Sequence, residues 1–258
     1  MSHAKRLTLG FFVLSALLAG CDFVGKGGDI EKPRLSLIVG VDISGSFLKS
    51  GLYDDAINFL AHYLYAHLNG LGGLEVPNAL FVSSIGGATL DEPKTFYPKQ
   101  TFEKKSIKEI AQTLREIFPK GTVNPFTDYN AFFEQIAITV KNKKLVLRPV
   151  SIVMISDGIP DIKMEGRTNF RSIKLKPLEG LARNITLRLL YTSAGVGKSW
   201  QTKVPRSRVK IWTQDAEVMV SWKDPKIYVP EKPVREQTSF FDWIKDNVDF
   251  GVAARRVD

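Results

Sequence analysis

The chain has 258 residues, of which 44% are hydrophobic and 24% charged, a composition that suits one compact domain and leaves little room for two. Its 20 glycines and 13 prolines are near the average for folded proteins, which argues against extensive disorder. The formal net charge of +9 suits a nucleic-acid binder and equally a protein held near anionic lipid headgroups, so charge alone does not choose between them.

Residues 1–20 are typical of a signal peptide. Lys5 and Arg6 precede 14 apolar residues, a run too short to span a bilayer comfortably. The run leads into residues 18–21, LAGC, which resemble a bacterial lipobox, and Cys21 is the only cysteine of the chain. The resemblance implies that Cys21 is lipidated and becomes the new N-terminus. The alternative is a secretory peptide or an N-terminal anchor helix that contains a cysteine by chance.

The segment 21–33 consists of the lipidated position and residues 22–33, whose glycine and charge content is that of a short flexible tether. Asp22 comes directly after the cysteine, and in enteric bacteria this resembles the signal for retention in the inner membrane. We therefore expect a lipoprotein of the bacterial cell envelope, anchored on the outer face of a membrane. The periplasmic face of the inner membrane is favoured.

After the tether, apolar runs of strand length alternate with segments of helical periodicity. Runs typical of strands lie at 34–41, 78–87, 147–156, 184–193, 208–213 and 217–222. Apolar residues at helical spacing lie at 51–71, 106–118, 128–142 and 239–247. The helix at 106–118 opens with Ser106 and Glu109, which are spaced as in a capping box.

This alternation predicts an α/β domain whose central sheet is largely parallel and covered by helices. We place the domain at 34–235 and a C-terminal helix and tail at 236–258. Ligands of such folds bind outside the carboxyl ends of the strands, so functional residues are expected there.

Three segments place hydroxyls and carboxylates at such strand ends or at the start of a helix. Asp-x-Ser-x-Ser occupies 42–46, Phe-Thr-Asp-Tyr occupies 126–129, and Ser-Asp-Gly occupies 156–158. In order and context the three resemble the von Willebrand factor A family, whose metal-ion-dependent adhesion site (MIDAS) is written Asp-x-Ser-x-Ser, a distant Thr, then Asp-Gly. The resemblance covers roughly 34–222 and implies a Rossmann-like, doubly wound sheet.

A small hard divalent cation prefers about six oxygen ligands, which these side chains offer. The resemblance implies that Ser44, Ser46 and Thr127 bind the ion directly, and that Asp42 and Asp157 hold it directly or through water. Mg²⁺, Mn²⁺ and Ca²⁺ all remain open as the metal. An acidic side chain of a partner protein would fill a free coordination position, so the resemblance implies a binding protein and not an enzyme.

Each segment also has an ordinary structural interpretation. Asp and Ser at strand ends form turns or cap helices, and Asp-Gly is a common turn. Thr127 with Asp128 would cap the helix that follows, and Thr122 is a nearby alternative to Thr127. Asp161 is expected to be a solvated loop residue. Gly45 is expected to let the backbone turn tightly.

Two enzyme motifs compete with the metal site. Asp42 after a buried strand suggests a haloacid-dehalogenase phosphatase, but that family needs a second Asp where Ser44 stands. Residues 194–199, AGVGKS, look like a phosphate-binding loop, but Thr192 stands where its first glycine belongs. The residues that follow do not predict a convincing helix, so we expect no nucleotide site.

The stretch 198–210 carries five lysines and arginines and no acid. We expect a solvated loop and edge strand, with anionic lipid or an acidic partner as the alternative. No histidine cluster supports zinc, and no nucleic-acid partner is expected. The function favoured is metal-dependent protein binding by a membrane-anchored lipoprotein. The alternatives are a structural or envelope-assembly lipoprotein with a non-functional metal site, and a metal-dependent phosphate-ester hydrolase.

Overall fold

The computed structural model describes residues 35–249 except 88, 90, 122–125, 162, 165 and 166. The predicted signal peptide, Cys21, Asp22, the tether and Thr122 therefore lie outside the described residues. No helix in the described part of the chain combines the length and the apolar character needed to cross a membrane.

Six strands form the central sheet in the order β3-β2-β1-β4-β7-β8. Their bounds are β1 Ser36–Val41, β2 Ala79–Ser84, β3 Tyr97–Pro98, β4 Val150–Ile155, β7 Ile185–Thr192 and β8 Val209–Asp215. Only β3, at one edge, pairs antiparallel with its neighbour. The residues of β1, β4 and β7 are all buried, as expected for strands covered on both faces. Two short strands, β5 Lys163–Met164 and β6 Arg167–Thr168, form a separate antiparallel ribbon.

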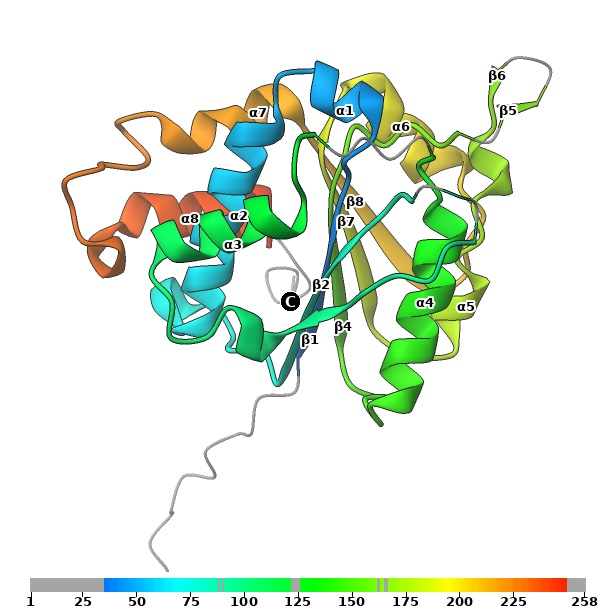
Figure 1. Ribbon diagram of the computed structural model, residues 1–258, viewed down its shortest axis with the longest axis horizontal. Coiled ribbons are helices and arrows are strands. Elements are labelled where there is room, and N and C mark those ends of the chain that lie inside the picture. The colour runs from blue at the N-terminus through cyan, green and yellow to red at the C-terminus, as the bar shows by residue number, and fades with distance from the viewer. Residues whose placement is uncertain are drawn as a thin grey trace, which may run out of the picture. The chain divides into compact units, whose positions relative to one another are not determined.

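Helices cover both faces of the sheet (Figure 1). Their bounds are α1 Gly45–Lys49, α2 Tyr53–Leu68, α3 Ile107–Ile117, α4 Tyr129–Asn142, α5 Lys176–Glu179, α6 Ala194–Lys203, α7 Ala216–Val220 and α8 Thr238–Asn247. One core cluster takes side chains from α2, α3, α7 and α8, and the other from α4, α5 and α6. The predicted α/β fold with a doubly wound, mostly parallel sheet is confirmed. The capping box of Ser106 and Glu109 at the start of α3 is also formed.

The strand predicted at 217–222 is wrong, because α7 and a 3₁₀ turn at Ser221–Lys223 occupy these residues. An apolar run of this length does not distinguish a strand from a short helix by its pattern alone. Met219 and Trp222 are both buried and lie three residues apart, which is the spacing of one helix face. Burial of that face against the core decides in favour of the helix.

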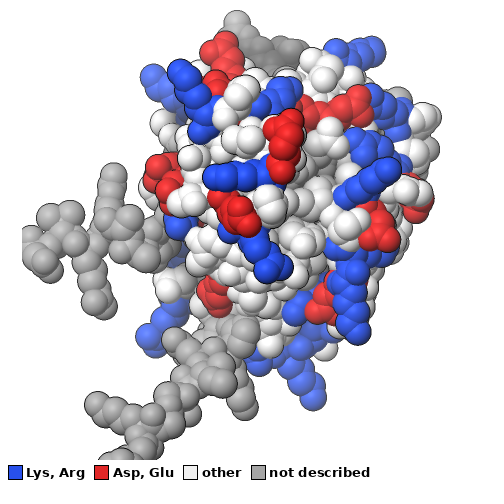
Figure 2. Space-filling view, turned by 90° about the vertical axis from the view of Figure 1, so that its left-hand side faces the viewer, with Lys and Arg blue, Asp and Glu red and all other residues white. Residues whose placement is uncertain are grey.

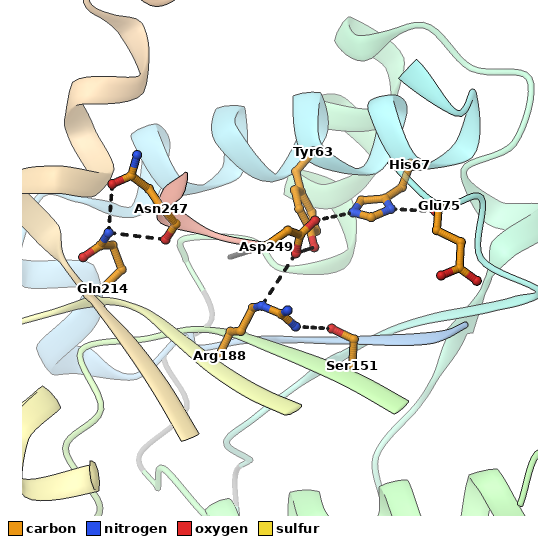
Figure 3. Close-up of polar contacts among 8 residues, drawn as sticks. All are labelled: Tyr63, His67, Glu75, Ser151, Arg188, Gln214, Asn247 and Asp249. Carbon is orange, nitrogen blue, oxygen red and sulfur yellow. Dashed lines mark hydrogen bonds and ion pairs between the residues drawn. The ribbon is translucent and has the colours of Figure 1, made fainter. Parts of the chain in front are cut away.

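A buried polar cluster lies between the sheet and helices α2 and α8 (Figure 3). Asp249, just after α8, accepts a hydrogen bond from the Tyr63 hydroxyl at 2.9 Å and contacts His67 Nε2 at 3.0 Å. Arg188 Nε lies 3.6 Å from the same carboxylate, an ion pair without a hydrogen bond. His67 Nδ1 lies 2.9 Å from the Glu75 carbonyl. Both ring nitrogens of His67 thus face oxygen atoms, one of Glu75 and one of Asp249.

Candidate metal centre

The two aspartates of the predicted site follow neighbouring strands. Val41 at the end of β1 is paired with Ile155 at the end of β4, and the Asp42 amide donates to the Ile155 carbonyl at 2.9 Å. From β1 the chain leads to β2 on one side, while β4 lies on the other side. Asp42 and Asp157 therefore lie at the point where the strand order reverses, which is the usual ligand crevice of a doubly wound sheet.

Asp42 is completely buried and holds the loop together. Its Oδ1 accepts a hydrogen bond from the Ser44 amide at 2.8 Å, and its Oδ2 accepts one from the Ser156 hydroxyl at 2.6 Å. Burial raises the pKa of Asp42 to about 6; the Ser156 hydrogen bond lowers it, and the nearby charge of Asp157 raises it further. Two carboxylates thus share one edge of the sheet without a basic side chain among these contacts.

The two serines of the motif lie together at the start of α1. Ser44 is the N-cap of the helix, and its Oγ accepts from the Phe47 amide at 3.4 Å. The Oγ atoms of Ser44 and Ser46 are 3.1 Å apart, so the two hydroxyls are within hydrogen-bonding distance of each other. Ser44 is buried and Ser46 exposed, so the pair reaches from the Asp42 loop to solvent. Gly45 is the first residue of α1, so the turn is a helix start.

Thr127 is buried in the loop that enters α4. The loop is tied to the segment that follows β2 by an antiparallel bridge between Gly87 and Phe126. Asp128 caps α4 by accepting from the Ala131 amide at 3.0 Å, so the capping role considered for Thr127 belongs to its neighbour.

Asp161 is exposed, as expected, but it is not an isolated loop residue, because its carboxylate accepts a hydrogen bond from the Thr127 amide. The sequence did not predict this contact, which joins loops far apart in the chain.

Tyr129 and Ser156 form a buried hydrogen-bonded chain that leads to Asp42. The Ser156 hydroxyl has one proton, which it donates to Asp42, so it accepts from the Tyr129 hydroxyl at 2.7 Å and from the Gly158 amide at 3.0 Å. The pKa of Tyr129 is raised by burial first and then by the charge of Asp42, with smaller contributions from Asp157 and Asp161. Three carboxylates therefore act on one hydroxyl. Sequence reasoning gave neither residue a role, although both lie in the quoted segments.

Gly158 fixes the position of Asp157. Its φ is +79°, and an added Cβ would come within 2.8 Å of Leu189 and 2.9 Å of Val196. Its carbonyl accepts from the Trp200 indole at 2.8 Å. Only glycine fits this conformation and this space, so Gly158 is required by the fold. The half-buried Asp157 before it accepts a hydrogen bond from the Ile159 amide at 3.0 Å.

The donor set fits a hard divalent cation. Asp42 and Asp157 bring charge, and Ser44, Ser46 and Thr127 bring neutral oxygens, the ligand types that Mg²⁺ and Ca²⁺ take. Asp42 contacts Ser44, Ser44 contacts Ser46, and Asp157 is near enough for its charge to act on Asp42. Thr127 contacts Asp161 through its backbone amide, and no hydrogen bond among the described residues joins its hydroxyl to the other four side chains. Within the described residues no three His, Cys, Asp or Glu side chains form a group able to hold a metal ion, so a site here depends on the hydroxyls.

The phosphate-loop lookalike is excluded by its structure, but for a different reason than the sequence indicated. The expectation of no convincing helix was wrong: α6 begins at Ala194, with Ser193 as its N-cap, and contains the Gly-Lys-Ser triplet. Gly197 is buried, and an added Cβ would lie 2.8 Å from Thr213 Oγ1. A phosphate-binding loop needs these residues in an open, non-helical conformation. Here they form a helix that packs on β8.

No family model matches the chain, and no curated protein is significantly similar to it. Several solved structures are similar at low identity. Proximal thread matrix protein 1 of the mussel byssus, with a zinc-occupied MIDAS motif, is 12% identical over 82% of this chain, with a TM-score of 0.44. The pilus adhesin SpaC of Lactobacillus rhamnosus GG is 10% identical over 83%, with a TM-score of 0.44. The human COPII-coat protein Sec24c is 12% identical over 75%, with a TM-score of 0.47.

This chain spans 46%, 30% and 32% of the lengths of those three proteins. The assignment of the site therefore depends on the residues of this chain and their contacts.

Proposed function

We propose that the protein binds a divalent cation between the loops after β1 and β4, and binds a partner protein through that cation. The observation that carries the proposal is the pair Asp42 and Asp157. One carboxylate is completely buried, the other lies close enough to raise its pKa, and no cationic side chain contributes to that pKa. A bound cation would remove the repulsion between these charges and the cost of burying Asp42.

A protein carboxylate is the ligand that we propose for the free coordination position. Three of the five side chains are neutral hydroxyls, which donate less electron density than carboxylates, so the cation would stay electron-poor and keep a free coordination position on the Ser46 side. Phe126 and Ile159, next in sequence to Thr127 and Gly158, are 37% and 40% exposed and offer apolar contacts beside the cation. This favours a protein surface over a free anion.

We further propose that the protein is a lipid-anchored envelope protein of bacteria and a binding protein with no catalytic activity. The anchor rests on the sequence around Cys21. The proposal of no catalysis rests on Ser44, which caps α1 where a phosphatase of the type considered needs an aspartate.

The cation is tested by thermal melting of the full chain with MgCl₂, MnCl₂ or CaCl₂ added after treatment with a chelator. Metal at ten times its Kd should stabilise the protein by about 1.4 kcal/mol. The melting midpoint of a domain of this size should then rise by about 4 °C. Asp157→Ala should abolish the rise. Asp242→Ala is the matched control, because Asp242 is an exposed residue of α8 away from the site.

If no divalent ion at millimolar concentration moves the wild-type midpoint, the cation proposal is wrong. If Asp242→Ala abolishes the rise as well as Asp157→Ala does, the ion binds elsewhere. Turnover of a phosphate ester with Mg²⁺ that is lost in Asp157→Ala would instead assign the centre to a hydrolase.

A further inference from the structure

The loop between α4 and β4, residues 143–149, presents an apolar tip to solvent. Leu147 is 82% exposed and Val146 is 37% exposed. Leu147 is the most exposed large apolar side chain among the described residues. A single exposed leucine is unremarkable on a protein surface. Its backbone and its charged neighbours make this one informative.

The loop holds Leu147 outward on a fixed backbone. Helix α4 ends in a Schellman motif, in which the Lys144 amide donates to the Lys141 carbonyl at 3.0 Å and the Leu145 amide to the Val140 carbonyl at 2.9 Å. Leu145, only 6% exposed, anchors the loop in the core. The next residues must therefore turn away from the core.

Leu147 occupies a turn position that favours another residue type. The Arg148 amide donates to the Leu145 carbonyl at 3.4 Å, and Leu147 has φ +71°, as at the third position of a type II turn. Glycine or asparagine is preferred there, because other side chains are strained. The Leu147 amide is fixed by the Leu181 carbonyl at 2.7 Å. The leucine thus bears strain and leaves its side chain in solvent, so its apolar surface is free for a contact outside the chain.

Basic side chains surround this tip. The loops 143–149, 180–184 and 204–208 lead into β4, β7 and β8, whose first residues are paired in register. Their charged residues are Lys143, Lys144, Arg148, Arg183, Arg206 and Arg208, with no acid among them. None of the six forms an ion pair with a described residue. The face over α2, α3 and α8 differs, because Figure 2 shows basic and acidic side chains intermixed there.

Two acidic side chains contact this edge through backbone amides: Glu75 accepts a hydrogen bond from the Leu35 amide at 3.0 Å, just before β1, and Glu179 contacts the loop before β8. The Glu179 carboxylate accepts from the amides of Ser207 and Arg208, so it joins two of the loops through their backbones.

The Arg206 guanidinium donates to the Val204 and Gln201 carbonyls, which hold it in place without neutralising its charge. The positive charges of all six side chains therefore remain available to an external anionic surface.

We propose that this edge of the sheet docks on an anionic lipid bilayer, with Leu147 and Val146 among the headgroups and the six basic side chains on lipid phosphates. An apolar tip surrounded by lysine and arginine is what such a surface requires. An acidic protein is the other possible partner, but lysine is depleted at protein interfaces, and a single projecting leucine needs a matching pocket there. A fluid headgroup layer adapts to it without one.

The path of the chain also favours a lipid bilayer as the partner of this edge. The Ser36 amide donates to the Pro149 carbonyl at 2.9 Å, so β1 begins beside the loop. If Cys21 is lipidated, residues 22–34 would join the bilayer to this edge, with a maximum extended reach of roughly 45 Å. The candidate metal centre lies at the opposite ends of the strands, near α1 in Figure 1. It would face away from the membrane, toward a partner.

The test uses the full chain with Cys21→Ser, which prevents lipidation and removes the only cysteine. Leu147→Cys in this background carries an environment-sensitive fluorophore at the tip. Its emission should shift to the blue with vesicles containing phosphatidylglycerol and not with pure phosphatidylcholine. The shift should weaken as salt screens the charges. Because the probe reports on the tip, binding through residues 1–20 does not mimic the signal.

Matched variants separate this surface from net charge. Replacing Lys143, Lys144 and Arg148 together by Gln should weaken binding to the anionic vesicles about a hundredfold. The same exchange at Lys226, Lys232 and Arg235, exposed residues between α7 and α8, should change it about twofold or less. Leu147→Asn should weaken binding about tenfold and should keep the fold, because asparagine tolerates this backbone conformation.

A probe that does not respond to anionic vesicles would refute the proposal. So would equal losses for the two triple variants, since binding would then follow net charge. A blue shift with poly-glutamate but not with vesicles would assign the edge to an acidic protein partner. Metal binding at the opposite edge is measured separately, so failure of one proposal does not affect the other.

Discussion

Two aspartates of this protein, the fully buried Asp42 and the mostly buried Asp249, have opposite environments. Burial alone would raise the pKa of Asp249, but the hydrogen bond and charge of His67 and the charge of Arg188 outweigh it and lower that pKa. Asp42 is more deeply buried than Asp249, and its carboxylate accepts hydrogen bonds from a hydroxyl and an amide. Its pKa is raised to about 6, and the charge that acts on it is the negative charge of Asp157.

The difference separates a structural carboxylate from a candidate ligand. Asp249 has its cations within the chain, so its charge is used to fix the end of α8 on the sheet. Asp42 accepts from a hydroxyl and an amide, Asp157 accepts from the Ile159 amide, and neither forms an ion pair with a described basic residue. Burial of an uncompensated charge is costly. An external cation would supply at the metal centre what His67 and Arg188 supply to Asp249.

The largest effect is expected from Asp249→Asn. Removing the charge leaves Arg188 buried without its partner, and this should cost about 3 kcal/mol of unfolding free energy. Urea denaturation at pH 7 measures the loss. Added metal should not restore it. A loss well below 1 kcal/mol would show that the cluster does not depend on the carboxylate charge.

The same exchange at Asp42 should act in the opposite direction when metal is absent. The raised pKa means that the charged carboxylate of Asp42 lowers the unfolding free energy by about 3 kcal/mol at pH 7. Imperfect hydrogen bonding of the amide reduces the gain, so Asp42→Asn should stabilise the metal-free protein by about 1–2 kcal/mol. It should also abolish the metal-induced rise in melting midpoint. A loss of stability in Asp42→Asn would contradict the difference proposed between Asp42 and Asp249.

The pH dependence of the two carboxylates should also differ. Because the pKa of Asp42 is raised on folding, its contribution to stability is complete below pH 3.8 and is lost as pH rises through about 6. Because the pKa of Asp249 is lowered, its contribution is present above its ordinary pKa and is lost as pH falls through the lowered value.

Denaturation of the metal-free protein between pH 4 and 7 should therefore show a decline that Asp42→Asn lacks. Saturating Mg²⁺ should suppress this decline, and the shift caused by the metal should grow as pH rises through about 6. A metal-induced shift that is the same at pH 5 and pH 7 would exclude Asp42 as the group that titrates.

The buried strands could be predicted because β1, β4 and β7 are apolar throughout, a pattern that burial on both faces produces. Helix α6 could not. It contains Gly195 and Gly197, which disfavour helices, and it forms because Trp200 is buried and Gly197 lets the helix approach β8 closely. The pattern of apolar residues along the chain does not indicate tertiary contacts of this kind.

At the metal centre, sequence reasoning succeeded where spacing determines proximity. Ser44 and Ser46 are two residues apart at one helix start, and their hydroxyls meet. It missed contacts between loops distant in the chain. Asp161 reaches the Thr127 amide, and the Tyr129 hydroxyl reaches Ser156. These contacts depend on how the helices pack on the sheet, which residue spacing does not encode.

The smallest effect on stability is expected from Ser46→Ala, and it gives the most selective test of the metal centre. Ser46 is exposed, and its hydroxyl contacts only Ser44 among the hydrogen bonds of described residues, so unfolding free energy should change by less than about 0.5 kcal/mol. Metal affinity should nevertheless fall about tenfold, read from midpoint against metal concentration.

Ser50→Ala is the matched control for this variant. Ser50 lies at the other end of α1, where its hydroxyl donates to the Phe47 carbonyl at 2.6 Å. That variant should lose up to about 1 kcal/mol of stability and keep its metal affinity. The two variants would then show that Ser50 contributes to helix stability and Ser46 to cation binding, although both serines lie on the same short helix. Equal metal affinity in both variants would remove Ser46 from the ligand set and leave Asp42, Asp157, Ser44 and Thr127 to hold the ion.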